Sequence, residues 1–111
     1  NITVILANVA AIKKDPAWAP DGESLLFTMN SPDKDKFEVY FVKRDGTCLI
    51  PLTRDFPSAE NPVVAPAGDT FLFVSNRTGK RHIFIKPFPK KPECPPAPPP
   101  AVEPASAAPE P

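Results

Sequence analysis

The chain has 111 residues, with 13 basic and 13 acidic side chains and a formal net charge of +0 at pH 7. A chain of this length forms at most one small domain with appendages. Its balanced charge creates no overall field that would select nucleic acid or an acidic membrane surface. No stretch reaches the roughly 20 apolar residues that a membrane span requires, so we expect no transmembrane segment.

The first element that we expect is a strand over residues 2–9. Apolar side chains occur on both of its faces, which is typical of a strand that is covered on both sides. The chain begins with Asn rather than Met. Either the removal of a leader or a fragment of a longer protein would explain that start.

Four strands separated by turn signals are expected between residues 15 and 53. Asp21 accepts hydrogen bonds from its own backbone in such turns, and Gly22 supplies a positive φ. The pair Asp45-Gly46 is a strong hairpin signal. Pro51 has no N–H to donate, which predicts an edge position for the fourth strand. The four expected strands cover residues 17–19, 24–29, 37–43 and 47–53.

A second set of expected strands covers residues 62–65, 70–75 and 82–86. No fourth strand follows, because a proline-rich segment begins in its place. We expect residues 2–9 to pair with residues 82–86 and to complete a second four-stranded sheet. The alternative is that residues 2–9 add to the sheet of a partner protein.

The two sets of strands are copies of each other. An internal repeat of about 40 to 50 residues with strand–turn–strand content is typical of sheet modules that stack, as in propellers. An offset of 46 residues aligns seven identities: Pro16/Pro62, Ala19/Ala65, Pro20/Pro66, Gly22/Gly68, Leu26/Leu72, Phe27/Phe73 and Asn30/Asn76.

Both copies resemble the blade of TolB-type β-propellers. The first copy reads PAWAPDG, SLLFTMN, EVYFVK, RDGT and IPLT, and the second reads PVVAPAG, TFLFVSNR, TGKR and HIFIK. The resemblance covers about residues 15–86. It departs from the family pattern in the second copy, where Val64 takes the place of Trp18 and Ala67 takes the place of Asp21. The resemblance implies one four-stranded antiparallel blade in each repeat.

We therefore predict an all-β fold. Two propeller-blade-like four-stranded antiparallel sheets would form an incomplete propeller or a small sandwich, followed by an extended proline-rich tail. The blades would occupy residues 1–86, with the first repeat over about residues 15–53 and the second over about residues 61–86. The tail would occupy residues 87–111.

Eleven of the 18 prolines lie in the predicted tail. Such a segment cannot bury enough apolar area to offset its ordering entropy, and its expected free state is extended polyproline II. Polyproline segments are preformed ligands for aromatic grooves. The tail is therefore the candidate anchor to a partner, with Pro95, Pro96, Pro98, Pro99 and Pro100 as its partner-binding residues.

Six cations lie between residues 70 and 92 with no acidic residue among them. They predict either a basic face for anionic headgroups or an acidic partner, or cations that only keep a sheet edge soluble. These residues are Arg77, Lys80, Arg81, Lys86, Lys90 and Lys91.

Two cysteines and one histidine are the other reactive side chains. Cys48 and Cys94 form either a disulfide that holds the tail against the first repeat or two separate thiols, and both alternatives remain open. His82 has no partners of the kind that a catalytic triad needs, so we expect an exposed strand residue.

Metal and cofactor chemistry have no support in the sequence. Two cysteines and one histidine are too few for a closed zinc site. The carboxylates of Asp33, Asp35 and Glu38 lack the spacing of a calcium loop. We expect no catalytic residue, no cofactor and no enzyme activity.

The sequence favours a non-enzymatic, protein-binding or structural subunit. It would dock on a larger, membrane-embedded envelope complex, of which a bioenergetic complex is one example. It would bind from the periplasmic or another extracytoplasmic side, with the tail as anchor. One alternative is a fragment of a larger TolB-like propeller, such as the non-catalytic part of a peptidase. A third hypothesis is a small-molecule cleft between the blades near Trp18.

Overall fold

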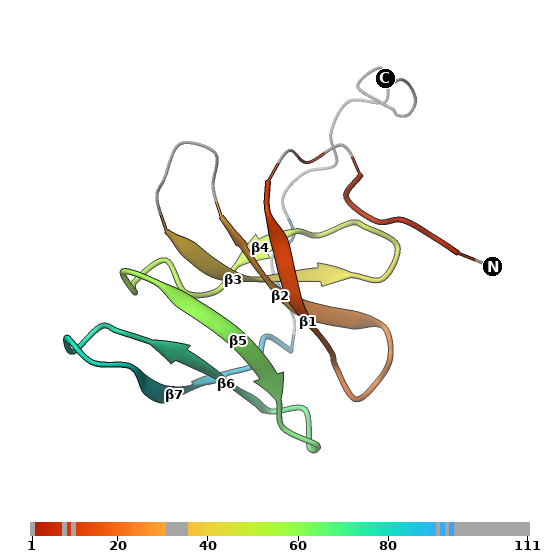
Figure 1. Ribbon diagram of the computed structural model, residues 1–111. Helices are drawn as coiled ribbons and strands as arrows, with labels where there is room; N and C mark the ends of the chain where they lie inside the picture. The colour runs from red at the N-terminus through yellow and green to blue at the C-terminus, as the bar shows by residue number, and fades with distance from the viewer. Residues whose placement is uncertain are drawn as a thin grey trace.

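The computed structural model describes residues 2–7, 9, 11–30, 36–90, 92 and 94. Their strands form two antiparallel sheets, and the described residues contain no helix (Figure 1). The predicted all-β fold with two antiparallel sheets is therefore confirmed. The first sheet has the order β1 (Lys13–Trp18), β2 (Ser24–Asn30), β3 (Phe37–Lys43) and β4 (Ile50–Pro51). The second has the order β5 (Ala59–Val64), β6 (Thr70–Ser75) and β7 (His82–Pro87).

Glycines at positive φ close the tight turns between neighbouring strands. Gly22 has a φ of 71° between β1 and β2, and Gly46 has a φ of 87° between β3 and β4. Side chains without a glycine's freedom rarely adopt these angles. The turns keep neighbouring strands in register, so that Leu26 of β2 lies opposite Phe41 of β3.

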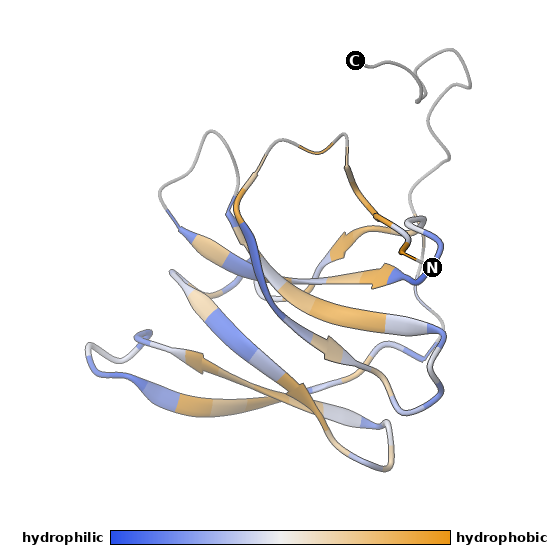
Figure 2. Ribbon diagram, turned by 45° about the vertical axis from the view of Figure 1, so that its right-hand side comes forward, coloured by the Kyte–Doolittle hydropathy of each residue, from blue (hydrophilic) through white to orange (hydrophobic). Residues whose placement is uncertain are grey.

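The two sheets pack face to face and enclose the main hydrophobic core. Aromatic rings of the second sheet dominate it, and Phe56 bridges to them with ring centroids 4.9 Å from Phe73 and 5.0 Å from Phe84. Figure 2 shows apolar stretches on strands of both sheets. The buried cluster consists of Leu26, Val39, Phe41, Cys48, Phe56, Ala59, Phe71 and Phe73.

The internal duplication is visible in the backbone. Asp15 in β1 and Asn61 in β5 both have a φ of 57°, and each lies where its strand shifts register against the next. The two residues are 46 positions apart, which is the offset of the sequence repeat. Each copy therefore contains the same β-bulge, a local kink that is inherited with the repeat.

The strand predicted over residues 2–9 is wrong. Residues 2–7 and 9 lie outside any strand, and Leu6 has a φ of 57°, which extended backbone excludes. The segment instead packs Ile5, Leu6 and Val9 against the first sheet, on the face that carries Phe27. Among the described residues the second sheet therefore has three strands, with β7 at its edge.

The predicted fourth strand over residues 47–53 is reduced to Ile50–Pro51. Cys48 has a φ of 63°, which interrupts extended backbone before the strand begins. Pro51 has no N–H for the ladder. The edge position predicted from Pro51 agrees with the order of the first sheet.

Candidate protein-binding surface

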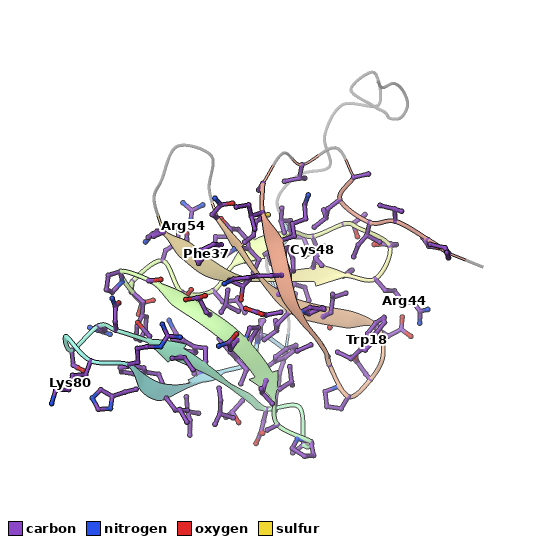
Figure 3. All side chains as sticks on the ribbon, in the orientation of Figure 1. Trp18, Phe37, Arg44, Cys48, Arg54 and Lys80 are labelled. Atoms are coloured by element: carbon purple, nitrogen blue, oxygen red, sulfur yellow. A yellow bond between two sulfur atoms is a disulfide. The ribbon has the colours of Figure 1, made fainter. Side chains whose placement is uncertain are left out.

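The described basic residues lie in two groups toward opposite ends of β7. Arg77, Lys80 and Arg81 belong to the turn between β6 and β7, whereas Lys90 follows the opposite end of β7 (Figure 3 labels Lys80). A six-residue strand spans about 20 Å at roughly 3.3 Å per residue, so β7 holds the two groups apart. Lys91 and the anchor prolines from Pro95 to Pro100 lie outside the described residues.

Several of these cations have partners within the fold. Lys86 donates a hydrogen bond to the Asp55 carboxylate at 2.9 Å, which lowers the pKa of Asp55. The Arg81 guanidinium lies 3.8 Å from Glu60, and the Arg77 guanidinium lies 4.7 Å from the Phe56 ring centroid. Neighbouring acids and rings therefore engage much of the charge that the sequence suggested for a partner.

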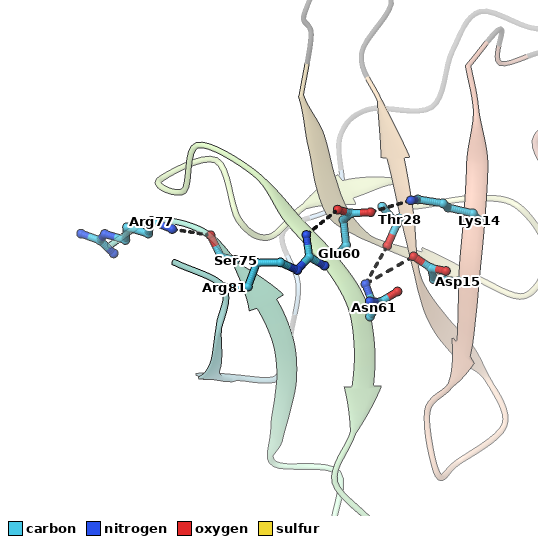
Figure 4. Close-up of polar contacts among 8 residues, drawn as sticks. All are labelled: Lys14, Asp15, Thr28, Glu60, Asn61, Ser75, Arg77 and Arg81. Atoms are coloured by element: carbon cyan, nitrogen blue, oxygen red, sulfur yellow. Dashed lines mark hydrogen bonds and ion pairs between the residues drawn. The ribbon is translucent and has the colours of Figure 1, made fainter. Parts of the chain in front are cut away.

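Glu60 is the centre of a polar contact between the two sheets. Its carboxylate accepts a hydrogen bond from Lys14 of β1, which raises the pKa of Lys14, and also pairs with Arg81 (Figure 4). Beside it, the Asn61 N–H lies 3.2 Å from the Thr28 hydroxyl and 3.4 Å from the Asp15 carboxylate. These contacts fix β5 across the first sheet.

Cys48 and Cys94 form a disulfide. Of the two alternatives that the sequence left open, the structure therefore contains the cross-link to the first repeat. The segment after β7 returns over that sheet, where the ring centroid of Phe88 lies 5.9 Å from that of Phe41. The disulfide holds Cys94 against the first sheet.

A pocket of about 360 Å³ lies beside this returning segment, at the turn end of the first sheet. Its charges balance: Asp21, Glu23 and Asp45 face Lys43, Arg44 and Lys90. The Thr47 hydroxyl and N–H donate to Asp45 and lower its pKa. The pocket selects no single sign of ligand charge.

Trp18 does not line this pocket. Its side chain is 60% exposed, and the Arg44 guanidinium stacks 5.6 Å from its ring centroid. Trp18 is therefore an exposed side chain outside this pocket, and the cleft predicted near it stays a prediction.

The other reactive side chains do not converge. His82 is exposed at the start of β7. Glu38 is fully buried, with its carboxylate 3.7 Å from Arg54, whereas Asp33 and Asp35 lie outside the described residues. Within the described part, no group of three or more His, Cys, Asp or Glu side chains is placed to hold a metal ion.

The most distinctive surface is the side of the second sheet that faces away from the first. It carries five apolar side chains in cross-strand register, of which Val63 is 58%, Ile83 70% and Ile85 66% exposed. Contiguous exposed apolar side chains of this kind make a surface a candidate interaction site. We call this surface the outer face; its residues are Val63, Leu72, Val74, Ile83 and Ile85.

The outer face was not predicted, although the sequence contains a signal for it. The strand TFLFVS has apolar residues at four consecutive positions, so both of its faces are apolar. Only the face with Phe71 and Phe73 is buried in the core. The apolar residues between them, Leu72 and Val74, therefore indicate a second contact surface.

The outer face has a covered counterpart in the first sheet. The strand registers match Leu72 and Ile85 with Leu26 and Phe41, and they match Val63 with Ala17. Leu26 is fully buried because the second sheet covers it. The same face of the repeat is thus covered in the first copy and bare in the second.

No protein-family model matches the chain, and a search of curated proteins finds no match. The likeness to TolB-type blades therefore rests on the repeat motifs. The described residues contain no helix long and apolar enough to cross a membrane.

Proposed function

We propose that this chain is a non-enzymatic protein-binding subunit that docks on a larger, membrane-associated assembly. The outer face of the second sheet is the observation that carries this proposal. Burial of apolar surface is the main favourable term in protein association, at about 25 cal/mol per Å². Ile83 and Ile85 also lie on β7, an edge strand among the described residues, so a partner gains backbone partners beside apolar contacts.

The disulfide supports an extracytoplasmic location. Such cross-links persist in oxidising compartments and are rare in the cytosol. It also brings the chain at Cys94 back to the first sheet. The residues that follow would then extend from a fixed point, as an anchor on the assembly requires.

Affinity purification from detergent-solubilised native membranes tests the proposal. The tagged full chain is compared with a chain that ends at Cys94, which retains the disulfide, and with an Ile83→Asp/Ile85→Asp variant. We expect the full chain to recover one assembly at constant stoichiometry. Both variants should recover less of it, since each lacks one of the two proposed contacts.

Ile2→Asp is the matched control, because Ile2 is 94% exposed and lies away from the outer face. It should recover the assembly like the unmodified chain. Recovery of the tagged chain alone, or equal recovery by all four proteins, would contradict the proposed function.

A fragment of a larger TolB-like propeller is the second candidate. The observation in its favour is that the covered face at Leu26 recurs, bare, at Leu72. A further blade of the same protein would cover it. In that case the isolated chain should bind no separate assembly, and its outer-face variants should be more soluble than the unmodified chain.

A further inference from the structure

Residues at equivalent positions of the two repeats touch each other. Lys14 pairs with Glu60, the Asn61 N–H approaches Asp15, and Cys48 is bonded to Cys94. Each pair is separated by 46 residues, the offset of the repeat.

The two faces that meet are not equivalent: the first sheet contributes the face with Leu26, whereas the second contributes the face with Phe73, whose counterpart Phe27 lies on the opposite face of the first sheet. Non-equivalent faces meet when modules stack in one direction, head to tail, whereas a two-fold axis would bring equivalent faces together.

In head-to-tail stacking, the two faces of a sheet contact different neighbours. The second sheet covers the first with the face that carries Phe73 and Phe84, whose ring centroids lie 5.9 Å apart in a stacked pair. The equivalent pair in the first sheet is Phe27 and Tyr40, stacked at 6.0 Å. We call the surface that bears this pair the aromatic face of the first sheet; its buried residues are Phe27, Met29, Tyr40 and Val42.

We propose that the outer face binds the aromatic face of the first sheet in a second copy of this chain. The inference rests on the proposed function, in which the outer face binds protein, and it names the chemistry of the occupant. The contact within one chain is its template: an aromatic pair of one sheet lies on the apolar face of another. In the second copy, the pair Phe27–Tyr40 would take the place that Phe73–Phe84 occupies in the first.

The charges at the rim of this contact are complementary. Glu60 lies beside Lys14 within one chain, and continued stacking would place Lys14 of the second copy beside Glu60 of the first. Lysine and glutamate would then alternate along the stack, and no pair of like charges would meet. Complementary rim charges favour the correct register over its alternatives.

The described residues of the N-terminal segment, 2–7, 9 and 11, lie where the second copy would bind. The segment covers the aromatic face with Ile5, Leu6 and Val9. This cover is incomplete, because a cleft of about 140 Å³ remains between Leu6 and Phe27. Displacement of the segment would open the aromatic face, and the strength of self-association depends on that step.

Sedimentation velocity of the oxidised full chain over a wide range of concentrations tests the inference. We expect a concentration-dependent rise in mass. Ile85→Asp should require about tenfold or more protein for the same association, as the loss of a central contact does. The control Thr78→Asp, which adds the same charge in the exposed turn between β6 and β7, should associate like the unmodified chain.

A mixing experiment tests the head-to-tail geometry. The donor carries Ile85→Asp and lacks residues 1–11, so its aromatic face is open and its outer face is disabled. The acceptor is the unmodified chain, at a concentration at which it is monomeric on its own. We expect a one-to-one heterodimer, whereas contact between two outer faces would give none. If the shortened donor does not fold, full-length Leu6→Asp/Ile85→Asp takes its place, because an aspartate at position 6 also releases the segment.

Failure of the heterodimer with a folded donor, or association that is insensitive to Ile85→Asp, would overturn the inference. These outcomes differ from failure of the proposed function. If the outer-face variants lose the membrane assembly while the chain remains monomeric at every concentration, the protein-binding function stands and the second copy is the wrong occupant.

Discussion

Glu38 is a charged residue in an environment that disfavours its charge. Its side chain is fully buried in β3, and neither carboxylate oxygen has a hydrogen-bond partner. Its ion-pair partner Arg54 is 61% exposed at 3.7 Å, so water weakens the compensation. A buried polar group without hydrogen bonds costs free energy that an apolar side chain of similar volume does not.

We expect Glu38→Met to raise the free energy of unfolding by about 1–3 kcal/mol at neutral pH. Urea denaturation of the oxidised protein measures this change. Glu23→Met is the control and should change stability by no more than about 0.5 kcal/mol, because Glu23 is exposed. A loss of stability in Glu38→Met would show that the buried carboxylate has a stabilising partner.

Asp55 provides a pH-dependent contribution at the same scale. The hydrogen bond from Lys86 lowers its pKa in the folded state. A carboxylate whose folded pKa lies below the unfolded value stabilises the fold above the unfolded pKa, about 3.9 for Asp. That contribution is lost as the pH falls through the folded pKa.

Asp55→Asn should therefore flatten the acid limb of the stability profile and leave its neutral limb nearly parallel to that of the unmodified chain. Urea midpoints measured from neutral pH down to below the unfolded pKa check this. Because Asp55 is exposed, the effect should be small. Asp69→Asn, which replaces another exposed acid, is the control. If it flattens the acid limb equally, the effect of Asp55→Asn does not come from the hydrogen bond with Lys86.

At the scale of elements, strands bounded by clear turns were predictable. β3 and β6 have the predicted bounds, because each is rich in β-branched and aromatic residues and lies between polar turns. β4 was overestimated, since nothing in the sequence announces the positive φ of Cys48. The N-terminal segment was wrongly predicted to pair with residues 82–86 of the second sheet. Its apolar residues predict burial, but they do not indicate which sheet the segment packs against.

The candidate site was less predictable, for a related reason. The consecutive apolar residues of β6 and β7 predict two contact faces, but only the fold reveals that Phe71 and Phe73 use one and that Leu72 lies on the other. The basic residues are close in sequence, but β7 separates those in the turn before it from Lys90 after it. Asp55 and Glu60, which engage Lys86 and Arg81, lie before the run of cations that the sequence singled out.

The disulfide links the segment after β7 to the first sheet. Reduction, or replacement of both cysteines by alanine, should lower the free energy of unfolding by about 2–4 kcal/mol, because the cross-link closes a long loop. Urea denaturation with and without reductant measures this. The double-alanine variant should not respond to reductant. If the oxidised and reduced chains unfold at the same urea concentration, the cross-link adds nothing to the fold.

At the scale of the molecule, one module is used twice in two different environments. The second sheet buries the apolar face of the first copy, and the same face of the second copy remains open. Repeat proteins are stabilised by interfaces between neighbouring modules, and a terminal module normally carries a polar outer face. The apolar outer face of the second sheet is not such a polar cap, and this supports the proposed partner.

Leu26 and Leu72 put this asymmetry to a direct test, since they are equivalent residues of the same type. Leu26 is fully buried, so Leu26→Ala should lower the free energy of unfolding of the isolated chain by about 2–5 kcal/mol. Leu72 faces outward, so Leu72→Ala should cost less than about 1 kcal/mol in the same urea titration. Its main effect should appear as weaker association, because the side chain is buried only when a partner covers the outer face. Equal losses of stability for the two variants would mean that the outer face is already covered within the isolated chain, and the partner-binding role of that face would then fall.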